Sequence, residues 1–266
     1  MDDSVPRSAE GAVLAIADKA DSIAGMFALG LQPSGSRDPF ALRRAANGIV
    51  KMIADHKLPL PISKLFADAR AQYSGSEAQK RFVQELDFQA AMANFMRERI
   101  EFYLREVRGF AYDVVNAVLA VGSDDVGDAI ARAEAVSMVR GSDDFSSISL
   151  AFKRMKNILK QATEKGITPA VKYRTPETDD AERQLAARAA EMGHGFQASC
   201  NAKDYTGALL QLATLRKPID TFFDKVMVMV DDEHVRANRL ALLRNLLREF
   251  SIIADFSEIV TETKSS

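Results

Sequence analysis

The chain has 266 residues, of which 47% are hydrophobic and 27% are charged, so it can bury the core of one large domain or two modest ones. Its 35 Lys and Arg residues against 37 Asp and Glu residues give a formal net charge of -2. That balance excludes a general polycation and confines any nucleic-acid site to a local patch. The single cysteine, Cys200, excludes an internal disulfide and a zinc site built from several cysteines.

The sequence predicts neither export nor membrane insertion. Residues 1–6 are acidic and lack the apolar segment of a signal peptide. The longest apolar run, residues 11–17, is far shorter than the roughly 20 residues of a membrane-spanning helix. We therefore expect a cytoplasmic protein, and a lone cysteine fits such a reducing compartment. With 14 Gly, 8 Pro and no Trp, the chain has few residues for the turns of an all-β protein, so its composition favours helices.

The first part of the chain predicts three helices. Apolar residues recur densely over residues 8–31, which indicates a largely buried helix. Asp38 and Pro39 then stand as the N-cap and the first helical residue of a helix that reaches about Ala54. A short helix is expected over residues 63–72.

A linker-like sequence follows at residues 73–76, and we place the main boundary there, between residues 1–73 and residues 74–266. One long amphipathic segment covers residues 77–108 and must bend because of its length, and Gly109 is expected to end it. Further helices are expected over residues 111–120, 125–139, 145–165, 179–192, 205–216, 219–230 and 234–256. No alternation typical of strands occurs, so the predicted fold class is all-α.

The residues that would build an active site are absent from the sequence. There is no glycine-rich phosphate loop or dinucleotide fingerprint, and His56, His194 and His234 lie far apart without metal-ligand spacing. Cys200 has no neighbouring histidine or basic cluster in sequence, which indicates an inert thiol. None of the carboxylates stands in a strongly apolar run, and Asp18 comes nearest to doing so.

The helix expected over residues 145–165 has one apolar and one basic face. At 100° per residue, its apolar side chains fall together, and its basic side chains lie on the neighbouring and opposite arc. The apolar face consists of Ile148, Phe152, Met155 and Leu159, and the basic arc of Lys153, Lys156, Asn157 and Lys160. Between residues 153 and 165, Glu164 alone opposes five basic residues. This excess suits a phosphate backbone, and equally a solvated face whose lysines favour the helix dipole.

The last predicted helix carries a charged residue on its apolar side. Arg239 projects into the middle of an arc of apolar residues, where an unpaired guanidinium would cost several kcal/mol. We therefore expect a structural ion pair with a carboxylate, and Asp220, Asp224 and Asp255 are the candidates. Arg244 and Arg248, by contrast, lie on the polar side of this helix, open to a ligand or to water.

Several segments resemble a known family. Residues 215–229 and 236–243 are similar to the helical anticodon-binding domain of aminoacyl-tRNA synthetases, and within it to the β subunit of bacterial glycyl-tRNA synthetase. The same subunit is matched, in the right order, by residues 17–21, 30–44, 109–115 and 151–159. The resemblance covers essentially the whole chain but only the C-terminal part of the family's β chain.

This resemblance implies separate roles for two kinds of subunit. In the family, two α subunits carry the catalytic core that activates glycine with ATP and magnesium, and two β subunits hold the tRNA. The chain is therefore expected to be non-catalytic and to need no cofactor of its own. Its expected partners are tRNA-Gly, the α subunit and the N-terminal remainder of β. Residues 1–73 would be the end of an HD-type helical domain with a linker, and residues 74–266 a DALR-like anticodon-binding bundle.

The resemblance also ranks the candidate RNA-binding residues. An anticodon loop is held by basic groups on phosphates and by planar groups on splayed bases. The helix over residues 145–165 carries the family's Lys-Arg-x-x-Asn pattern, which favours Lys153, Arg154, Asn157 and Lys160. A second group comprises Arg97, Arg99 and Tyr103 on the long segment, Lys172 and Arg174 in the loop from Pro169 to Pro176, and Arg216 at a helix end.

Two other functions compete with RNA binding. The chain could be a helical interaction module that docks to the α subunit or to the rest of β, and exposed apolar surface around residues 8–31 would favour it. An HD-type hydrolase is the weakest alternative. Asp18 matches the closing aspartate of that signature, but the histidine and His-Asp pair that would precede it are missing.

Overall fold

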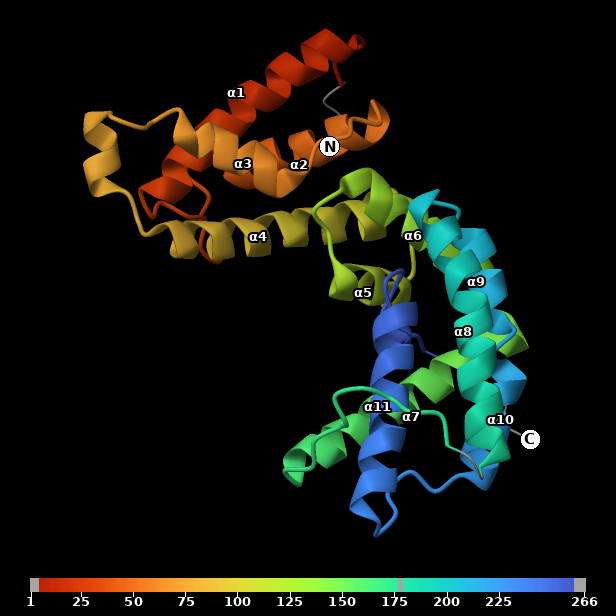
Figure 1. The fold of residues 1–266 in the computed structure, drawn as a ribbon. Coiled ribbons are helices and arrows are strands. Elements are labelled where there is room, and N and C mark those ends of the chain that lie inside the picture. The colour runs from red at the N-terminus through yellow and green to blue at the C-terminus, as the bar shows by residue number, and fades with distance from the viewer. Residues whose placement is uncertain (1–4, 177–178, 261–266) are drawn as a thin grey trace. The chain divides into compact units, whose positions relative to one another are not determined.

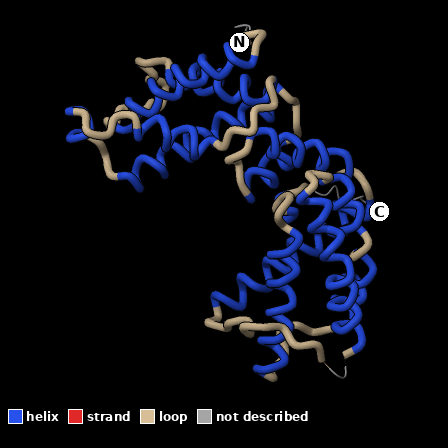
Figure 2. The backbone as a smooth tube through the Cα atoms, turned by 45° about the horizontal axis from the view of Figure 1, so that its top comes forward, coloured by secondary structure: helices blue, strands red, loops and turns tan. Residues whose placement is uncertain are grey.

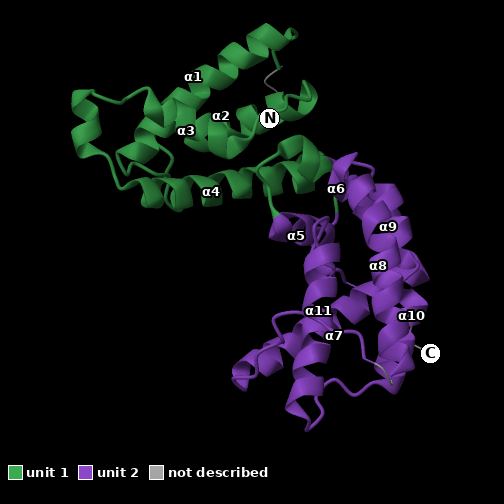
Figure 3. Cartoon of the chain, viewed as in Figure 1, with its two compact units in different colours: residues 1–110, 122–130 green, residues 111–121, 131–266 purple. Residues whose placement is uncertain are grey.

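The computed structural model describes residues 5–176 and 179–260 (Figure 1). Within these residues the regular structure consists of eleven α-helices and short 3-10 or π segments, without a strand (Figure 2). The all-α prediction is confirmed. The helices form two compact units (Figure 3). Unit 1 comprises residues 1–110 and 122–130, and unit 2 comprises residues 111–121 and 131–266.

Unit 1 is built around its first helix. Its helices are α1 (Ala9–Ala28), α2 (Leu42–Asp55), α3 (Ile62–Ala71) and α4 (Glu85–Phe102), with a 3-10 turn at Glu77–Arg81 and a π turn at Tyr103–Val107. Helix α1 packs on the other three. Phe27 of α1 and Phe95 of α4 meet in the core, with ring centroids 4.8 Å apart. This contact joins residues on either side of the boundary expected after residue 73.

That expected boundary lies inside unit 1. The ring of Tyr73 meets the ring of Phe82 edge-on at 5.7 Å, and its hydroxyl donates to the carbonyl of Asp21 at 3.4 Å. The backbone N–H of Val83 donates to the carbonyl of Ala28 at 2.8 Å, and the expected bend in the long segment falls at this point. Residues 74–110 thus fold with the helices that precede them. The assignment of residues 1–73 and 74–266 to two functional domains stays a prediction.

The start of α2 differs from the expectation. Asp38 and Pro39 are not the N-cap and the first helical residue, because the helix begins at Leu42 after Ala41, whose backbone is left-handed with φ of 54°. Asp38 still caps the helix from outside. Its carboxylate accepts the N–H groups of Leu42 at 2.8 Å and Arg43 at 3.0 Å, which satisfies two orphan donors of the first turn.

Unit 2 is a bundle of long helices. It contains α5 (Tyr112–Val121), most of α6 (Val126–Val139), α7 (Asp143–Glu164), α8 (Asp180–Asn201), α9 (Tyr205–Ala213), α10 (Arg216–Lys225), α11 (Glu233–Phe250) and a 3-10 turn η3 (Phe256–Glu258). Helix α8 packs on α9 and α10, and α7 packs on α10, α11 and η3 (Figure 1). Phe256 of η3 lies edge-on to Phe145 and Phe152 of α7, at 5.4 and 5.3 Å.

Helix α8 runs nine residues beyond the predicted end at Met192. Two glycines follow that residue, and glycine in a helix interior normally lowers helix stability. Here they allow close packing. A Cβ atom at Gly193 would collide with the carboxylate of Glu249, and one at Gly195 would lie 2.8 Å from the side-chain oxygen of Gln211.

Candidate nucleic-acid interface

Helix α7 presents a basic face that unit 2 leaves open. Ser142 caps its start by accepting the N–H of Phe145 at 3.2 Å. Phe145, Ile148, Phe152 and Met155 are buried, whereas Lys153, Arg154, Asn157 and Lys160 are exposed. In the part of the chain that the structure describes, the side chains of Lys153 and Asn157 make no hydrogen bond or ion pair. The predicted two-faced character of this helix is confirmed.

Lys156 does not belong to this open face. Its ammonium pairs with the carboxylate of Asp255 at 2.6 Å and donates to the hydroxyl of Ser257 at 3.1 Å. Glu258 lies 3.8 Å away. Burial raises the pKa of Asp255, but the hydrogen bonds from Lys156 and Ser257 outweigh it and hold the pKa below its ordinary value. The charge of Lys156 is therefore used inside the fold, between α7 and η3.

Arg154 is held in place by an aromatic ring. Its guanidinium lies over the ring of Phe223, which comes from α10, with 4.2 Å between the guanidinium carbon and the ring centroid. Leu150, one turn earlier on α7, leaves 54% of its surface exposed. Lys160 has a weak partner in Glu164 at 4.0 Å, and both side chains are exposed. The open face therefore combines charge with a planar group and an apolar side chain.

The loop after α7 is clipped to α11: main-chain atoms of the loop form hydrogen bonds with α11. Ala170 donates its N–H to the carbonyl of Ala237 at 2.9 Å. Asn238 accepts the N–H of Arg174 and donates to its carbonyl, both at 2.8 Å. Arg244 donates to the carbonyls of Ala170 and Val171 at 2.9 and 3.1 Å, so it holds the loop and is not open to a ligand.

The clipped loop presents its side chains to solvent. Lys172 and Arg174 are exposed, and Val171 leaves 97% of its surface exposed. Tyr173 lies inward, where burial and the neighbouring charge of Glu182 raise the pKa of its hydroxyl. The loop thus exposes two cations from a fixed backbone.

Arg239 is paired as expected but with other partners. Its guanidinium donates to Glu182 at 2.9 Å and to Asp179 at 2.8 Å, both at the start of α8. Asp220, Asp224 and Asp255 are therefore wrong as partners. Asp220 lies 3.7 Å from Arg216, Asp224 is exposed, and Asp255 is paired with Lys156. The reason is that the turn of α11 carrying Arg239 faces the N-terminus of α8.

Arg216 at the start of α10 is engaged within the protein. It pairs with Asp144 of α7 at 2.5 Å, and this hydrogen bond raises the pKa of its guanidinium. Asp144 and Asp220 together neutralise its charge, so Arg216 is a weak candidate for a phosphate contact.

The other predicted residues belong to unit 1. Arg99 pairs with Glu98 at 3.0 Å and lies against the ring of Phe95. Tyr103 is only 6% exposed, and burial followed by the charge of Asp55 raises the pKa of its hydroxyl. Its ring has no open face on which a base could stack. These two side chains therefore support the fold of unit 1.

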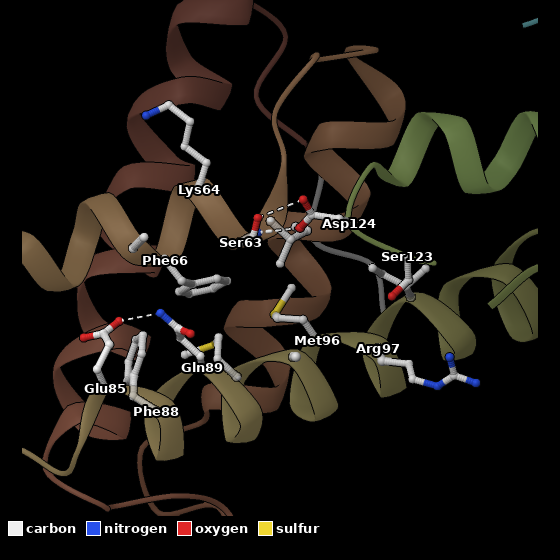
Figure 4. Close-up of a pocket in the computed structure, with 15 residues that line it drawn as sticks. Ser63, Lys64, Phe66, Glu85, Phe88, Gln89, Met96, Arg97, Ser123 and Asp124 are labelled. Carbon is white, nitrogen blue, oxygen red and sulfur yellow. Dashed lines mark hydrogen bonds between the residues drawn. The ribbon is translucent and has the colours of Figure 1, made fainter. Parts of the chain in front are cut away.

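Arg97 lines a cavity of about 540 Å³ between α3 and α4 of unit 1 (Figure 4). The walls are mostly apolar and include Phe66, Phe88 and Met96. At one end the carboxylate of Asp124 accepts the N–H of Ser63 at 2.6 Å and its hydroxyl at 2.8 Å. Asp124 thereby caps the start of α3.

The described residues hold no cluster of three or more His, Cys, Asp or Glu side chains able to bind a metal ion. Asp18, the residue that matched the hydrolase signature, is exposed on α1. Across residues 5–176 and 179–260, no helix is both long and apolar enough to cross a membrane.

Comparison with known proteins identifies the class of the helical unit. Residues 148–251 match the family model for the DALR anticodon binding domain, and this range includes the whole open face of α7. Most of unit 2 is thus of the class of helical anticodon-binding domains. Residues 1–120 match the model for the glycyl-tRNA synthetase beta subunit. The chain belongs to the glycyl-tRNA synthetase β-subunit family and matches its C-terminal part.

Three curated relatives are similar over nearly the whole chain, and each is a glycine–tRNA ligase beta subunit. The relative from Acidobacterium capsulatum is 50% identical over 267 residues, which cover 98% of this chain and 36% of the relative. Those from Syntrophus aciditrophicus and Desulforamulus reducens are 41% and 38% identical over 97% and 98% of this chain, again 36% of each relative. The chain therefore spans about a third of the length of these relatives.

Proposed function

We propose that this chain binds the anticodon arm of tRNA-Gly through the open face of α7 and positions the tRNA for glycylation. It acts in the cytoplasm as the tRNA-holding part of a β subunit in an α2β2 enzyme. The α subunit uses ATP and magnesium, and this chain takes no catalytic part. The observation that carries the proposal is the exposed basic face of α7, Lys153, Arg154, Asn157 and Lys160, within the segment that matches an anticodon-binding domain.

The side chains of this face suit both parts of an RNA loop. Lys153 and Lys160 are flexible point charges, appropriate to phosphate oxygens. Asn157 carries a donor and an acceptor on one amide and can read the edge of an unpaired base. Binding energy gained at the anticodon arm restricts the motion of the whole tRNA. That restriction helps present the acceptor end to the catalytic subunit, where orientation matters most.

The test is the affinity of the chain for a glycine tRNA transcript across a salt series. Replacing both Lys153 and Lys160 by Ala should weaken binding and make the slope of log K against log salt shallower by about 0.7 for each lost phosphate contact. Helicity measured by circular dichroism should stay unchanged because both side chains are exposed. Lys80→Ala, an exposed lysine of unit 1, is the control. Unchanged affinity and slope in the double variant would contradict the proposal.

A second transcript with a changed anticodon tests specificity. Weaker binding to this transcript is the expected result for an anticodon reader. The alternative function, a module that docks to the α subunit or the rest of β with little RNA contact, is favoured by one observation. Val13 and Leu14 of α1 are large apolar side chains exposed on unit 1. Absence of measurable binding to both transcripts would favour this alternative.

A further inference from the structure

The contact between Arg154 and Phe223 gives one side chain of the open face a fixed orientation. An exposed arginine normally samples many rotamers, whereas this guanidinium lies 4.2 Å from the centroid of the Phe223 ring. Phe223 is half-buried on α10, and Phe222 beside it is buried in the core, so the ring comes from an anchored position. Since Arg154 itself is exposed, the guanidinium face turned away from the ring is accessible.

The neighbours of Arg154 do not suit a purely electrostatic face. On a helix, residues three and four apart lie on the same side, which places Leu150, Arg154 and Asn157 in one row. Leu150 leaves 54% of its surface exposed. Binding a phosphate backbone requires neither an exposed leucine nor a guanidinium placed over an aromatic ring. A flat apolar surface edged by polar groups, by contrast, is the chemistry of an unpaired nucleobase.

We propose that the guanidinium of Arg154, which lies over the ring of Phe223, is the platform on which an unpaired base of the anticodon loop stacks. This inference rests on the proposed function and deepens it by separating base contacts from phosphate contacts on the same helix. Arg154 touches the base, and Phe223 is a positioning residue that acts through Arg154. The base lies on the guanidinium face turned away from the ring, as a third layer beside Leu150.

The experiment uses the full chain and a glycine tRNA anticodon arm in which each loop base in turn is replaced by the fluorescent base 2-aminopurine. Binding is followed by its fluorescence and by affinity across a salt series. Arg154→Lys keeps the positive charge but loses the planar group. We expect a loss of affinity of roughly 5- to 160-fold, the range for loss of one stacked base, with an unchanged salt slope. The fluorescence change at one loop position should disappear.

Matched variants separate stacking from charge and from folding. Phe223→Leu should act in the same direction as Arg154→Lys, because it keeps an apolar side chain but removes the ring, and Phe223→Tyr should restore binding. Lys160→Ala should make the salt slope shallower and leave the fluorescence change intact. Arg154→Lys replaces an exposed side chain, so the test survives even if a Phe223 variant fails to fold.

Two results would overturn the inference in different ways. If Arg154→Lys binds with wild-type affinity and fluorescence while Lys160→Ala binds more weakly, Arg154 is not a platform and the proposed function stands. If the wild-type chain binds neither the tRNA nor the anticodon arm, the proposed function fails and the inference fails with it.

Discussion

At the scale of single residues, the ion pairs of Arg239 form a largely buried charge network in unit 2. Glu182 is 1% exposed, and its second oxygen accepts the amide of Asn238 at 3.3 Å. Asp179 both pairs with Arg239 and caps α8 by accepting the N–H of Glu182. Every charge in this network depends on Arg239, because it bridges the two carboxylates.

Removing Arg239 alone should therefore be costly. Arg239→Met leaves Glu182 buried without its cation, and we expect the free energy of unfolding to fall by about 3–5 kcal/mol. Urea denaturation followed by circular dichroism measures it. The double variant Arg239→Met/Glu182→Met should recover part of the loss, since no charge then stays buried. A double variant that is less stable than the single one would contradict this account.

The same residues show what sequence can predict at this scale. The place of Arg239 in an apolar arc was enough to predict an ion pair, because a lone buried guanidinium is too costly. The identity of the partners was not predictable, since Asp179 and Glu182 lie 60 and 57 residues earlier in the chain and meet Arg239 only through packing of α8 on α11. The contact between Arg154 and Phe223 was not predictable either, because only the packing of α10 on α7 places the ring of Phe223 under Arg154.

At the scale of elements, Lys156 joins α7 to η3. Its pairing with Asp255 helps hold the pKa of that carboxyl below the ordinary 3.8. A carboxyl with a depressed pKa in the folded state contributes stability that is fully present above its unfolded pKa. That contribution is lost as the pH falls through the folded pKa. The link between the two elements should therefore weaken in acid.

The expected pH dependence can be measured by difference. Lys156→Met should be less stable than the wild type at neutral pH. The difference should shrink as the pH falls from about 5 through the depressed pKa of Asp255, because protonation then removes the pair from the wild type too. Urea melts between pH 7 and pH 2.5 give the curve. Lys153→Met on the open face is the control and should show no such trend. A constant difference for Lys156→Met over that range would rule out the pair as its cause.

Element positions were more predictable than element ends. A helix was expected at the place of each α-helix that the structure describes, from apolar periodicity together with capping and turn residues. The observed helix ends differ from the predicted ones where side chains outside the helix determine its length. Asp38 caps a helix that starts four residues later, and α8 continues through glycines that its neighbours approach closely. The expected boundary at residues 73–76 does not coincide with a boundary between the compact units, because turn residues there do not reveal that Phe95 packs on Phe27.

At the scale of the whole molecule, unit 2 is built from two separate segments of the chain. Residues 111–121 come first, residues 122–130 belong to unit 1, and residues 131–266 complete unit 2. The first segment forms α5, and residues of the second segment form hydrogen bonds and an ion pair with it. Its Ala117 carbonyl accepts the N–H of Asp255 at 2.8 Å, and its Val118 carbonyl accepts the guanidinium of Arg132 at 2.9 Å. Asp113 pairs with Arg140 at 2.8 Å.

A fragment of residues 111–266 should therefore unfold cooperatively, and a fragment of residues 131–266 should not. The shorter one loses α5, whose four large apolar side chains, Val114, Val115, Val118 and Leu119, are buried. At roughly 1.5–3 kcal/mol for each, that loss is comparable to the whole stability of a domain. Urea denaturation of both fragments is the measurement. Equal transition midpoints would show that α5 is dispensable.

The loop clipped to α11 has a consequence for how this surface can change. The atoms of Ala170, Val171 and Arg174 that hold the loop are all main-chain atoms. Main-chain groups survive nearly any substitution, so positions 171, 172 and 174 can vary without releasing the loop. The backbone conformation of this loop therefore does not depend on which side chains stand at these positions. Libraries randomised at these three positions, with Asn238 and Arg244 kept, would sample new binding chemistries on an unchanged backbone.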